Sequence, residues 1–226
     1  MNIVALICAR GNSRGIKDKN LLKYKNTTLL GQAIKHSLKS KLINRVIIST
    51  DSKKIVKEAK KYNVEIPFLR PSNLAKDNSP ELLAWRHAVE FLEKENKKKI
   101  DYIVSVPTTS PLRAVSDINR AIILARRKKL DIVFSITESS KNPFFNMVSI
   151  KANKLQLICK KNNRIFRRQD APKCYDLTTV CYVFKPKYIF KTNDLFKGKT
   201  GFVTIPKERS LDIDDKFDYR VAKILG

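Results

Sequence analysis

The sequence predicts an α/β fold in which a mostly parallel sheet is flanked by helices on both faces. Ile3 to Cys8 is a continuous apolar run, which is typical of a parallel strand buried on both sides. From there to about residue 136, short apolar runs alternate with segments whose apolar residues recur every three or four positions, the spacing of amphipathic helices. The 226 residues, 42% of them hydrophobic, suffice for one domain with a sizeable core.

The remaining elements follow from the same periodicities. Further strands are predicted where short apolar runs follow polar turns, at 46–49, 64–69, 102–106, 132–136 and 202–205. Helices are predicted from apolar stripes at 30–42, 55–59, 82–92, 118–125 and 217–225. Asp51 or Ser52 can cap the second helix, Pro80 suits the first turn of the third, and Ser116 can cap the fourth.

The alternation of strand and helix stops at Thr137. Three strand-like segments follow with little helix between them, at 144–150, 155–159 and 179–184. We interpret 137–184 as a β-rich arm inserted into a single domain of residues 1–226. An exposed apolar arm is rare on a soluble monomer, and a twofold partner is the commonest way to bury it. The sequence therefore predicts a homodimer.

The chain carries 47 Lys and Arg against 21 Asp and Glu, for a formal net charge of +26. An excess of this size points to an anionic partner such as nucleic acid, an acidic membrane face or a phosphorylated small molecule. The cations are scattered, however, and short clusters at 97–99 and 126–129 fall where helices are predicted to end and where cations complement the helix dipole. We interpret most of the charge as solvated surface, and expect neither a specific nucleic-acid partner nor a membrane partner.

The four cysteines form no CxxC pair, which argues against a zinc ribbon and against a disulfide framework. The apolar run near the start is too short to span a bilayer, and no basic segment precedes it as in a secretion signal. We therefore expect a soluble, reduced, cytoplasmic protein.

A basic loop, residues 9–20, follows the first strand. It contains two glycines, small polar residues and four cations, so its backbone N–H groups and its cations can surround a triphosphate. It matches neither GxGxxG nor a Walker A loop, which argues against a dehydrogenase and a P-loop ATPase. A solvated basic turn is the alternative, but ligands of α/β sheets bind beyond the carboxyl ends of strands, and this position favours a phosphate site.

A second candidate site is Asp212-Ile213-Asp214. Two carboxylates two residues apart on an extended segment project to the same side, and such oxygens suit Mg²⁺ that bridges nucleotide phosphates. The alternative is that Asp214 or Asp215 caps the last helix.

Covalent catalysis by the protein is not indicated. His36 and His87 are the only histidines, and they lie on separate predicted helices without a carboxylate neighbour that suggests a triad. GxSxG is absent, so no nucleophile elbow is predicted. The chemistry indicated is direct displacement at phosphorus.

Taken together, these motifs resemble the acylneuraminate cytidylyltransferases, the CMP-sialic acid synthetase family, over nearly the full length. The matching segments occur in the family's order: 9–15 with 19–21, 48–51, 69–71 with Leu74-Ala75 and Asp77, 109–113, Arg168-Gln169 with Pro172, and 212–214. The segments 142–146 and 171–176 are closer to the bacterial branch that acts on legionaminate-type sugars. The resemblance implies a Rossmann-like nucleotidyltransferase fold with a dimerisation arm.

The resemblance also implies a reaction and its residues. CTP and a nine-carbon 2-keto-3-deoxy sugar acid would give a CMP-sugar and pyrophosphate. The expected site residues are these: for the nucleotide Arg10, Gly11, Asn12, Ser13, Arg14, Lys19, Asn20 and Arg70; for the sugar Thr109, Ser110, Arg113, Arg168 and Gln169, with the last two reaching the partner subunit's site; for Mg²⁺ Asp212 and Asp214; and for catalysis Arg10, Lys19 and the same two aspartates. The general base stays open between one of these aspartates and a metal-bound water.

Two departures from the family bear on the sugar. Pro107-Thr108 stand where the family has Gln-Pro, and Thr178-Thr179 replace Asn-Gly or Asn-Ala. The reaction type is therefore predicted more firmly than the substrate. The alternatives are a nucleotidyltransferase for an octulosonate or a sugar 1-phosphate or, in a different class, a basic nucleic-acid-binding module. The octulosonate synthetases match less well, because their Gln-Gly-Asp-Glu-Pro loop is missing.

Overall fold

A six-stranded sheet forms the centre of the computed structural model, which describes all residues except 14, 97–98 and 160–164. The strand order is β10 (Thr200–Thr204), β6 (Ile132–Glu138), β9 (Tyr175–Phe184), β5 (Tyr102–Ser105), β1 (Ile3–Cys8) and β4 (Arg45–Ser49). Only β9 runs antiparallel to its neighbours, β5 and β6, and the other pairings are parallel. The predicted mostly parallel α/β sheet is confirmed.

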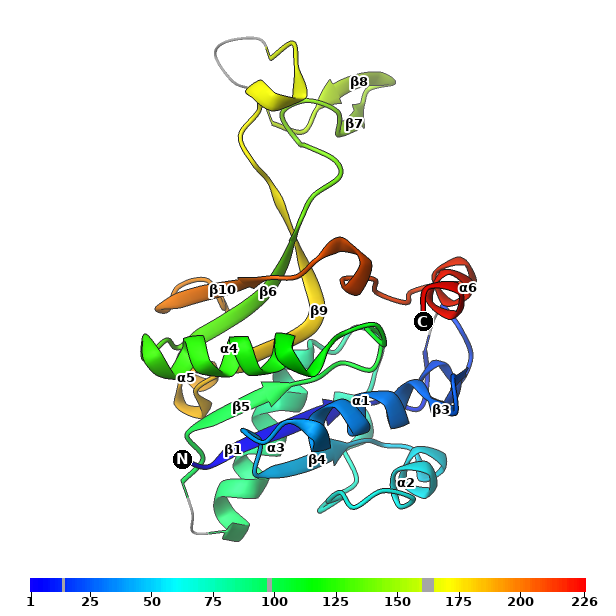
Figure 1. Ribbon diagram of the computed structural model, residues 1–226, viewed down its shortest axis with the longest axis vertical. Coiled ribbons are helices and arrows are strands. Elements are labelled where there is room, and N and C mark those ends of the chain that lie inside the picture. The colour runs from blue at the N-terminus through cyan, green and yellow to red at the C-terminus, as the bar shows by residue number, and fades with distance from the viewer. Residues whose placement is uncertain (14, 97–98, 160–164) are drawn as a thin grey trace.

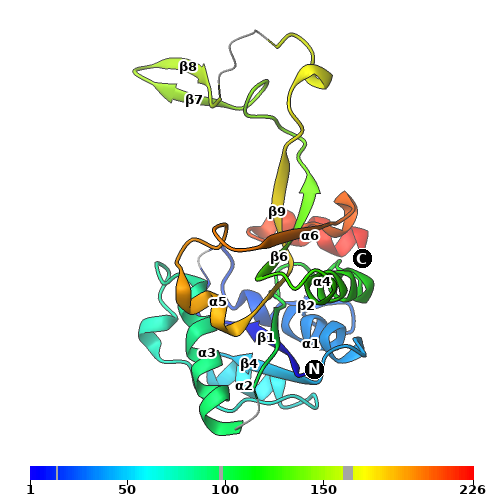
Figure 2. The ribbon, with the colours of Figure 1, turned by 90° about the vertical axis from the view of Figure 1, so that its left-hand side faces the viewer.

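Helices cover both faces of the sheet (Figure 1). On one face α1 (Leu29–Lys39), α2 (Lys53–Ala59) and α4 (Val115–Arg127) pack against Ile3, Ala5 and Ile7 of β1. On the other face α3 (Glu81–Asn96) and α5 (Pro186–Lys191) pack against Val4 and Leu6. Alternate residues of one strand thus enter two separate cores, which is why β1 is apolar at every position. The side view in Figure 2 shows α1 and α4 on one side and α3 and α5 on the other.

A third, smaller core joins the basic loop to the C-terminal helix. The hairpin of β2 (Lys23–Tyr24) and β3 (Thr27–Thr28) and helix α6 (Lys216–Leu225) enclose Ile16, Tyr24 and Ile213. Ile213 is completely buried there. This packing places the two carboxylates that flank Ile213 beside the basic loop, although the two segments are almost 200 residues apart in the sequence.

The arm projects from the sheet at the ends of β6 and β9 (Figures 1 and 2). It carries the hairpin β7 (Val148–Lys151) and β8 (Lys154–Leu157) and the short 3₁₀ helix η3 (Arg168–Asp170). The first predicted strand is shorter than expected because 142–146 forms a turn, in which Asn142 Oδ1 accepts from Phe144 N–H at 2.9 Å. The predicted boundary at 184 is wrong: 182–184 pair with both β5 and β6 and belong to the main sheet.

Two other predicted elements differ in the structure. Residues 64–69 do not form a strand but make isolated parallel bridges, from Glu65 to Ile47 and from Leu69 to Thr50, because Pro67 between them has no N–H to donate to the ladder. The cap of α4 is Ala114 and not Ser116; its N–H donates to Asp117 Oδ2 at 3.0 Å. No helix in the described part of the chain is long and apolar enough to cross a membrane.

Asp215 is the N-cap of α6, and its Oδ1 accepts from Phe217 N–H at 2.7 Å and from Asp218 N–H at 3.0 Å. These backbone hydrogen bonds lower the pKa of Asp215. Asp212 and Asp214 are therefore not needed as caps, and the capping alternative applies to Asp215 alone.

We predict that Asp215→Ala lowers the melting temperature at pH 7, because the ionised carboxylate then no longer satisfies the first N–H groups of α6. A lowered pKa means that this stabilisation exists above the ordinary pKa of Asp, about 3.9, and disappears as the pH falls through the lower folded-state value. In thermal melts from pH 7 to pH 3, the difference in melting temperature between the wild type and Asp215→Ala should become smaller. Asp215→Asn, which keeps an oxygen acceptor, is the control and should melt close to the wild type; an equal loss in both variants would contradict the capping role.

Candidate active site

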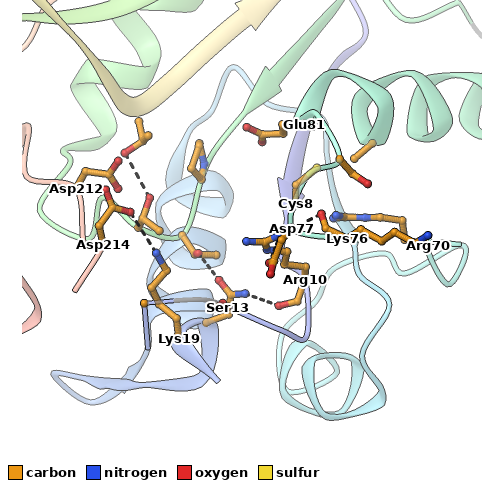
Figure 3. Close-up of a pocket in the computed structure, with 18 of the residues that line it drawn as sticks. Cys8, Arg10, Ser13, Lys19, Arg70, Lys76, Asp77, Glu81, Asp212 and Asp214 are labelled. Atoms are coloured by element: carbon orange, nitrogen blue, oxygen red, sulfur yellow. Dashed lines mark hydrogen bonds and ion pairs between the residues drawn. The ribbon is translucent and has the colours of Figure 1, made fainter. Parts of the chain in front are cut away.

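A cavity of about 420 Å³ opens at the carboxyl edge of the sheet, where the loops after β1 and β5 and the connection between α2 and α3 meet the segment that connects β10 to α6. We call this connecting segment, residues 205–215, the aspartate segment. Of the site residues predicted from the sequence, the following line the cavity: Arg10, Ser13, Lys19, Asn20, Arg70, Thr109, Asp212 and Asp214. Figure 3 shows the two aspartates facing Lys19 on one side, with Arg10 and Arg70 on the other.

The basic loop is held in place by Asn20, which is almost completely buried. Its Nδ2 donates to Arg10 O at 2.8 Å, and its Oδ1 accepts from Thr108 Oγ1 at 2.5 Å. Gly11 N–H donates to Asp51 Oδ1 at 2.8 Å, so the loop is also tied to the end of β4. Asn20 acts here by shaping the loop that a phosphate would contact.

The other predicted residues of this loop have different surroundings. Asn12 is exposed and does not line the cavity. Arg14 lies outside the described residues. Arg10 crosses to the opposite wall, where its Nη1 donates to Lys76 O at 3.1 Å and pairs with Asp77 at 2.9 Å.

Gly15 brings the basic loop into contact with the aspartate segment. A methyl group on its Cα would lie 2.0 Å from Asp214 O, so no larger residue fits at this position without moving one of the two backbones. Lys19 adds a second link, since its Nζ donates to Ile213 O at 2.8 Å and lies 3.5 Å from Asp214 Oδ1. A predicted phosphate loop and a predicted metal pair are thus parts of one site.

The two aspartates differ in their surroundings. Asp214 is largely exposed toward the solvent side, whereas Asp212 has a buried Oδ1 that no hydrogen bond within the described residues satisfies. An orphaned buried carboxylate oxygen fits a ligand that supplies positive charge, and hard oxygen donors suit Mg²⁺. The described residues contain no group of three or more His, Cys, Asp or Glu that could hold a metal.

Arg70 is buried at the end of the parallel bridge from Leu69 to Thr50. Its Nε donates to Ser49 Oγ at 3.0 Å, and its Nη2 donates to Ser49 O. Two bonds to one residue lock the planar guanidinium at the cavity wall. It can recognise a nucleotide there without losing side-chain entropy on binding.

Ser110 and Arg113 lie behind the cavity wall, which differs from their predicted contact with substrate. Ser110 is buried, and its Oγ lies 2.6 Å from Thr179 Oγ1. Arg113 is buried too, and its Nη2 donates to Pro107 O and, at 3.1 Å, to Thr179 O. Burial lowers the pKa of Arg113 to about 10. This arginine therefore links the two wall segments from within, because Pro107 and Thr179 line the cavity.

Arg168 and Gln169 belong to η3 on the arm and do not line the main cavity of the same chain. They line a separate hollow of about 360 Å³ together with Asn142, Pro172 and Lys173. Arg168 Nη2 donates to Ser139 O at 3.0 Å. The structure of one chain therefore does not bring the predicted sugar contacts of the arm to Asp212.

The sequence analysis missed Glu81, the first residue of α3, whose carboxyl group faces the cavity (Figure 3). Its Oε1 accepts from Trp85 Nε1 at 3.1 Å. Desolvation by burial raises the pKa of the Glu81 carboxyl, and the charge of Asp212 acts in the same direction, against the hydrogen bond from Trp85 and the charge of Arg70. The signal for Glu81 in the sequence was an acidic residue directly after Pro80, in the first turn of a predicted helix. Cys8 also lines the cavity, where burial raises the pKa of its thiol to about 12 and keeps it protonated.

The histidines do not contribute to the site. Neither His36 nor His87 lines the cavity. His36 contacts Gln32 within α1, and burial is the main cause that lowers its pKa to about 4. His87 packs edge-on against Phe68.

Comparisons with known proteins agree with this geometry. The model of a family described as "Cytidylyltransferase" matches residues 4–219. The chain is 32% identical over 223 residues to the CMP-N,N'-diacetyllegionaminic acid synthase of Campylobacter jejuni, which covers 99% of this chain and 94% of the relative. It is 26% identical over 225 residues to a pseudaminic acid cytidylyltransferase of the same species, covering 100% of this chain and 96% of the relative.

Among solved structures, a CMP:2-keto-3-deoxy-manno-octonic acid synthetase complexed with CTP superposes with a TM-score of 0.73 at 12% identity. The superposition covers 100% of this chain and 98% of that chain. At this identity the likeness concerns the fold, which it confirms as a nucleotidyltransferase type.

Proposed function

Because this chain belongs to the cytidylyltransferase family, we propose that it transfers CMP from CTP to a nine-carbon 2-keto-3-deoxy sugar acid of the legionaminate or sialate type. The observation that carries this proposal is the contact of the basic loop with the aspartate segment, Gly15 against Asp214, at the mouth of one cavity. The named relatives support the same reaction, since they are synthases of CMP-legionaminic and CMP-pseudaminic acid.

The charges around the cavity favour a nucleotide accompanied by a cation. Among its described lining residues there are four cations, Arg10, Lys19, Arg70 and Lys76, and four carboxylates, Asp77, Glu81, Asp212 and Asp214. The described lining is therefore formally neutral, and a triphosphate that binds here brings a negative charge that these residues do not compensate. A divalent cation removes that imbalance and strengthens binding in a site of low dielectric constant.

Asp212 and Asp214 are the residues that would hold Mg²⁺, which when bound would stabilise negative charge on the phosphate oxygens. Arg10 and Lys19 would neutralise the phosphates from the side of the basic loop. The anomeric hydroxyl oxygen of the sugar forms a bond to the α-phosphorus, and the bond from that phosphorus to the pyrophosphate oxygen breaks. The hydroxyl proton leaves to a carboxylate, for which Glu81 is an additional candidate because its carboxyl group faces the cavity.

The sugar specificity is proposed to depend on the wall that departs from the family. Pro107, Thr108 and Thr179 line the cavity, and these are the positions at which the sequence differs from the sialate enzymes. Wall residues with a different shape and hydrogen-bonding capacity select a different substituent pattern on the sugar.

The arm supports the proposal of a homodimer. Its side chains Ile150 and Leu155 are 75% and 71% exposed, although both belong to strands. A second copy would cover them, and we propose that Arg168 and Gln169 then reach the partner's cavity, where Arg168 can pair with the sugar carboxylate in a bidentate manner. A cytoplasmic location is part of the proposal because the free cysteines and the CTP requirement suit that compartment.

The direct test is pyrophosphate release from CTP with purified legionaminate, sialate or pseudaminate, in the presence of Mg²⁺. We expect turnover with at least one of these acids and none with sugar 1-phosphates. Activity only with an octulosonate or a sugar 1-phosphate would change the substrate class. Tight binding of nucleic acid, with an affinity that falls steeply with salt, and no turnover of any acidic sugar would support the nucleic-acid-binding alternative.

We predict that Asp212→Asn and Asp214→Asn each lower kcat by about 100-fold or more, because charge stabilisation that acts mainly in the transition state is lost. Asp215→Asn is the matched control, since it removes the same charge one residue further along and retains the cap of α6. It should keep nearly full activity. Normal turnover in all three variants would show that the aspartate segment does not hold a metal.

We predict that Arg168→Ala and Asp212→Ala are each inactive alone, and that mixing them at equal concentrations restores about a quarter of the wild-type activity if subunits exchange freely and one site of each heterodimer is intact. Stopped assays before and after exchange, with sedimentation to establish the oligomeric state, provide the measurement. An active monomer, or no recovery after demonstrated exchange, would contradict the composite site.

A further inference from the structure

Asp117 is a buried carboxylate that the proposed chemistry does not use. It lies in the first turn of α4, and its side chain has no exposed surface. Four nitrogen atoms donate to it: Ala114 N at 3.0 Å, Arg120 Nη2 at 2.8 Å, and Arg209 Nε and Nη2 at 3.0 and 2.9 Å. Burial by itself raises the pKa of Asp117, but the hydrogen bonds from Arg209, Ala114 and Arg120 outweigh burial and leave the pKa below its ordinary value.

Arg209 belongs to the aspartate segment. It ends the short 3₁₀ helix η4 (Lys207–Arg209), three residues before Asp212. Its Nε and Nη2 donate to different oxygens of Asp117. The pair therefore fixes the orientation of the guanidinium as well as its position. The segment is thereby attached to α4, a helix whose other residues pack against the main sheet.

At its start the aspartate segment is attached to β6, where Ile205 N–H donates to Ile136 O at 2.7 Å. Its other attachments lie near Asp214. Ile213 N–H donates to Thr109 O at 2.9 Å, and Lys19 binds Ile213 O and Asp214. Among the described residues, the ion pairs of this segment are those of Arg209 with Asp117 and of Lys19 with Asp214. Lys19 also lines the cavity and belongs to the residues proposed to neutralise the phosphates, so its contacts would change when a phosphate binds. The pair of Arg209 and Asp117 lies outside the cavity lining and is independent of the ligand.

We propose that Arg209 and Asp117 are positioning residues that orient the aspartate segment, so that Asp212 presents its unpartnered oxygen to the metal–nucleotide complex. This inference rests on the proposed function, because it assigns the pair a role in metal-assisted binding of CTP. The buried carboxylate of Asp117 is fixed on α4. By binding it, Arg209 fixes the backbone of the aspartate segment three residues before Asp212. The expected consequence is a metal affinity that depends on an ion pair outside the site.

The test compares CTP binding by isothermal titration calorimetry in Mg²⁺ and in EDTA, for the wild type, Arg209→Gln, Arg209→Lys and Arg120→Gln. Arg120→Gln is the matched control. It removes one hydrogen bond to Asp117 and one, at 3.0 Å, to Thr204 O at the end of β10, but Arg120 lies on α4 itself and contributes no bond to residues 205–215. Melting temperatures report the purely structural contribution of each arginine.

For Arg209→Gln we expect unchanged CTP binding in EDTA, because the basic loop and Arg70 are intact, and a loss of about tenfold or more in the affinity gained from Mg²⁺. The Mg²⁺ concentration that half-saturates turnover should rise in parallel. Arg209→Lys keeps the charge but lacks the planar guanidinium. Its gain in CTP affinity from Mg²⁺ should therefore lie between those of the wild type and Arg209→Gln. Arg120→Gln should keep the full gain from Mg²⁺.

The inference is overturned if the folded Arg209 variants keep the wild-type gain from Mg²⁺, or if Arg120→Gln loses as much of it as Arg209→Gln. If Arg209→Gln does not fold, Arg209→Lys alone decides between these outcomes. Failure of the proposed function has a different signature, since the wild type would then gain nothing from Mg²⁺ and Asp212→Asn would bind CTP as the wild type does. In that case the metal role fails together with this inference.

Discussion

The backbone of the basic loop touches the aspartate segment at one point, and the arrangement of the site depends on it. A side chain at Gly15 would collide with the carbonyl oxygen of Asp214, so glycine is required where these two distant segments meet. The buried Ile213 and the donation of Lys19 Nζ to Ile213 O hold the contact from either side. The cations Arg10 and Lys19 and the carboxylates Asp212 and Asp214 are thereby brought to one cavity.

The charges around the cavity are also balanced locally. A chain with a formal charge of +26 has a cavity whose described cations and carboxylates cancel, so the excess charge lies elsewhere on the surface. Local pairing decides the behaviour of the site more than the net charge does, because interactions inside a cavity are screened less than those at the surface. The ion pair of Asp117 and Arg209 extends this pattern behind the site, where a buried carboxylate on α4 holds the segment that carries Asp212.

The cavity wall formed by Pro107, Thr108 and Thr179 is held in place from behind. Arg113 is buried behind it and bonds to the backbones of both Pro107 and Thr179, which are the positions that depart from the sialate enzymes. A framework held by backbone contacts tolerates changes of side chain in front of it. This separates the basic loop and the aspartate segment from the part of the cavity that we propose selects the sugar, and it explains why the reaction class is easier to identify than the substrate.

The sequence by itself determined the α/β class, the position of the basic loop after β1 and the aspartate pair, because burial of a parallel strand and the polarity of the loop after it are local properties. It also indicated that 137–184 leaves the βα rhythm. Only the tertiary structure decided that β9 runs antiparallel in the middle of the sheet, that Arg113 lies behind the wall, and that Glu81 and Asp212 share a cavity. Strand order, burial of a cation and the meeting of residues more than a hundred positions apart depend on packing between elements, and no local pattern encodes them.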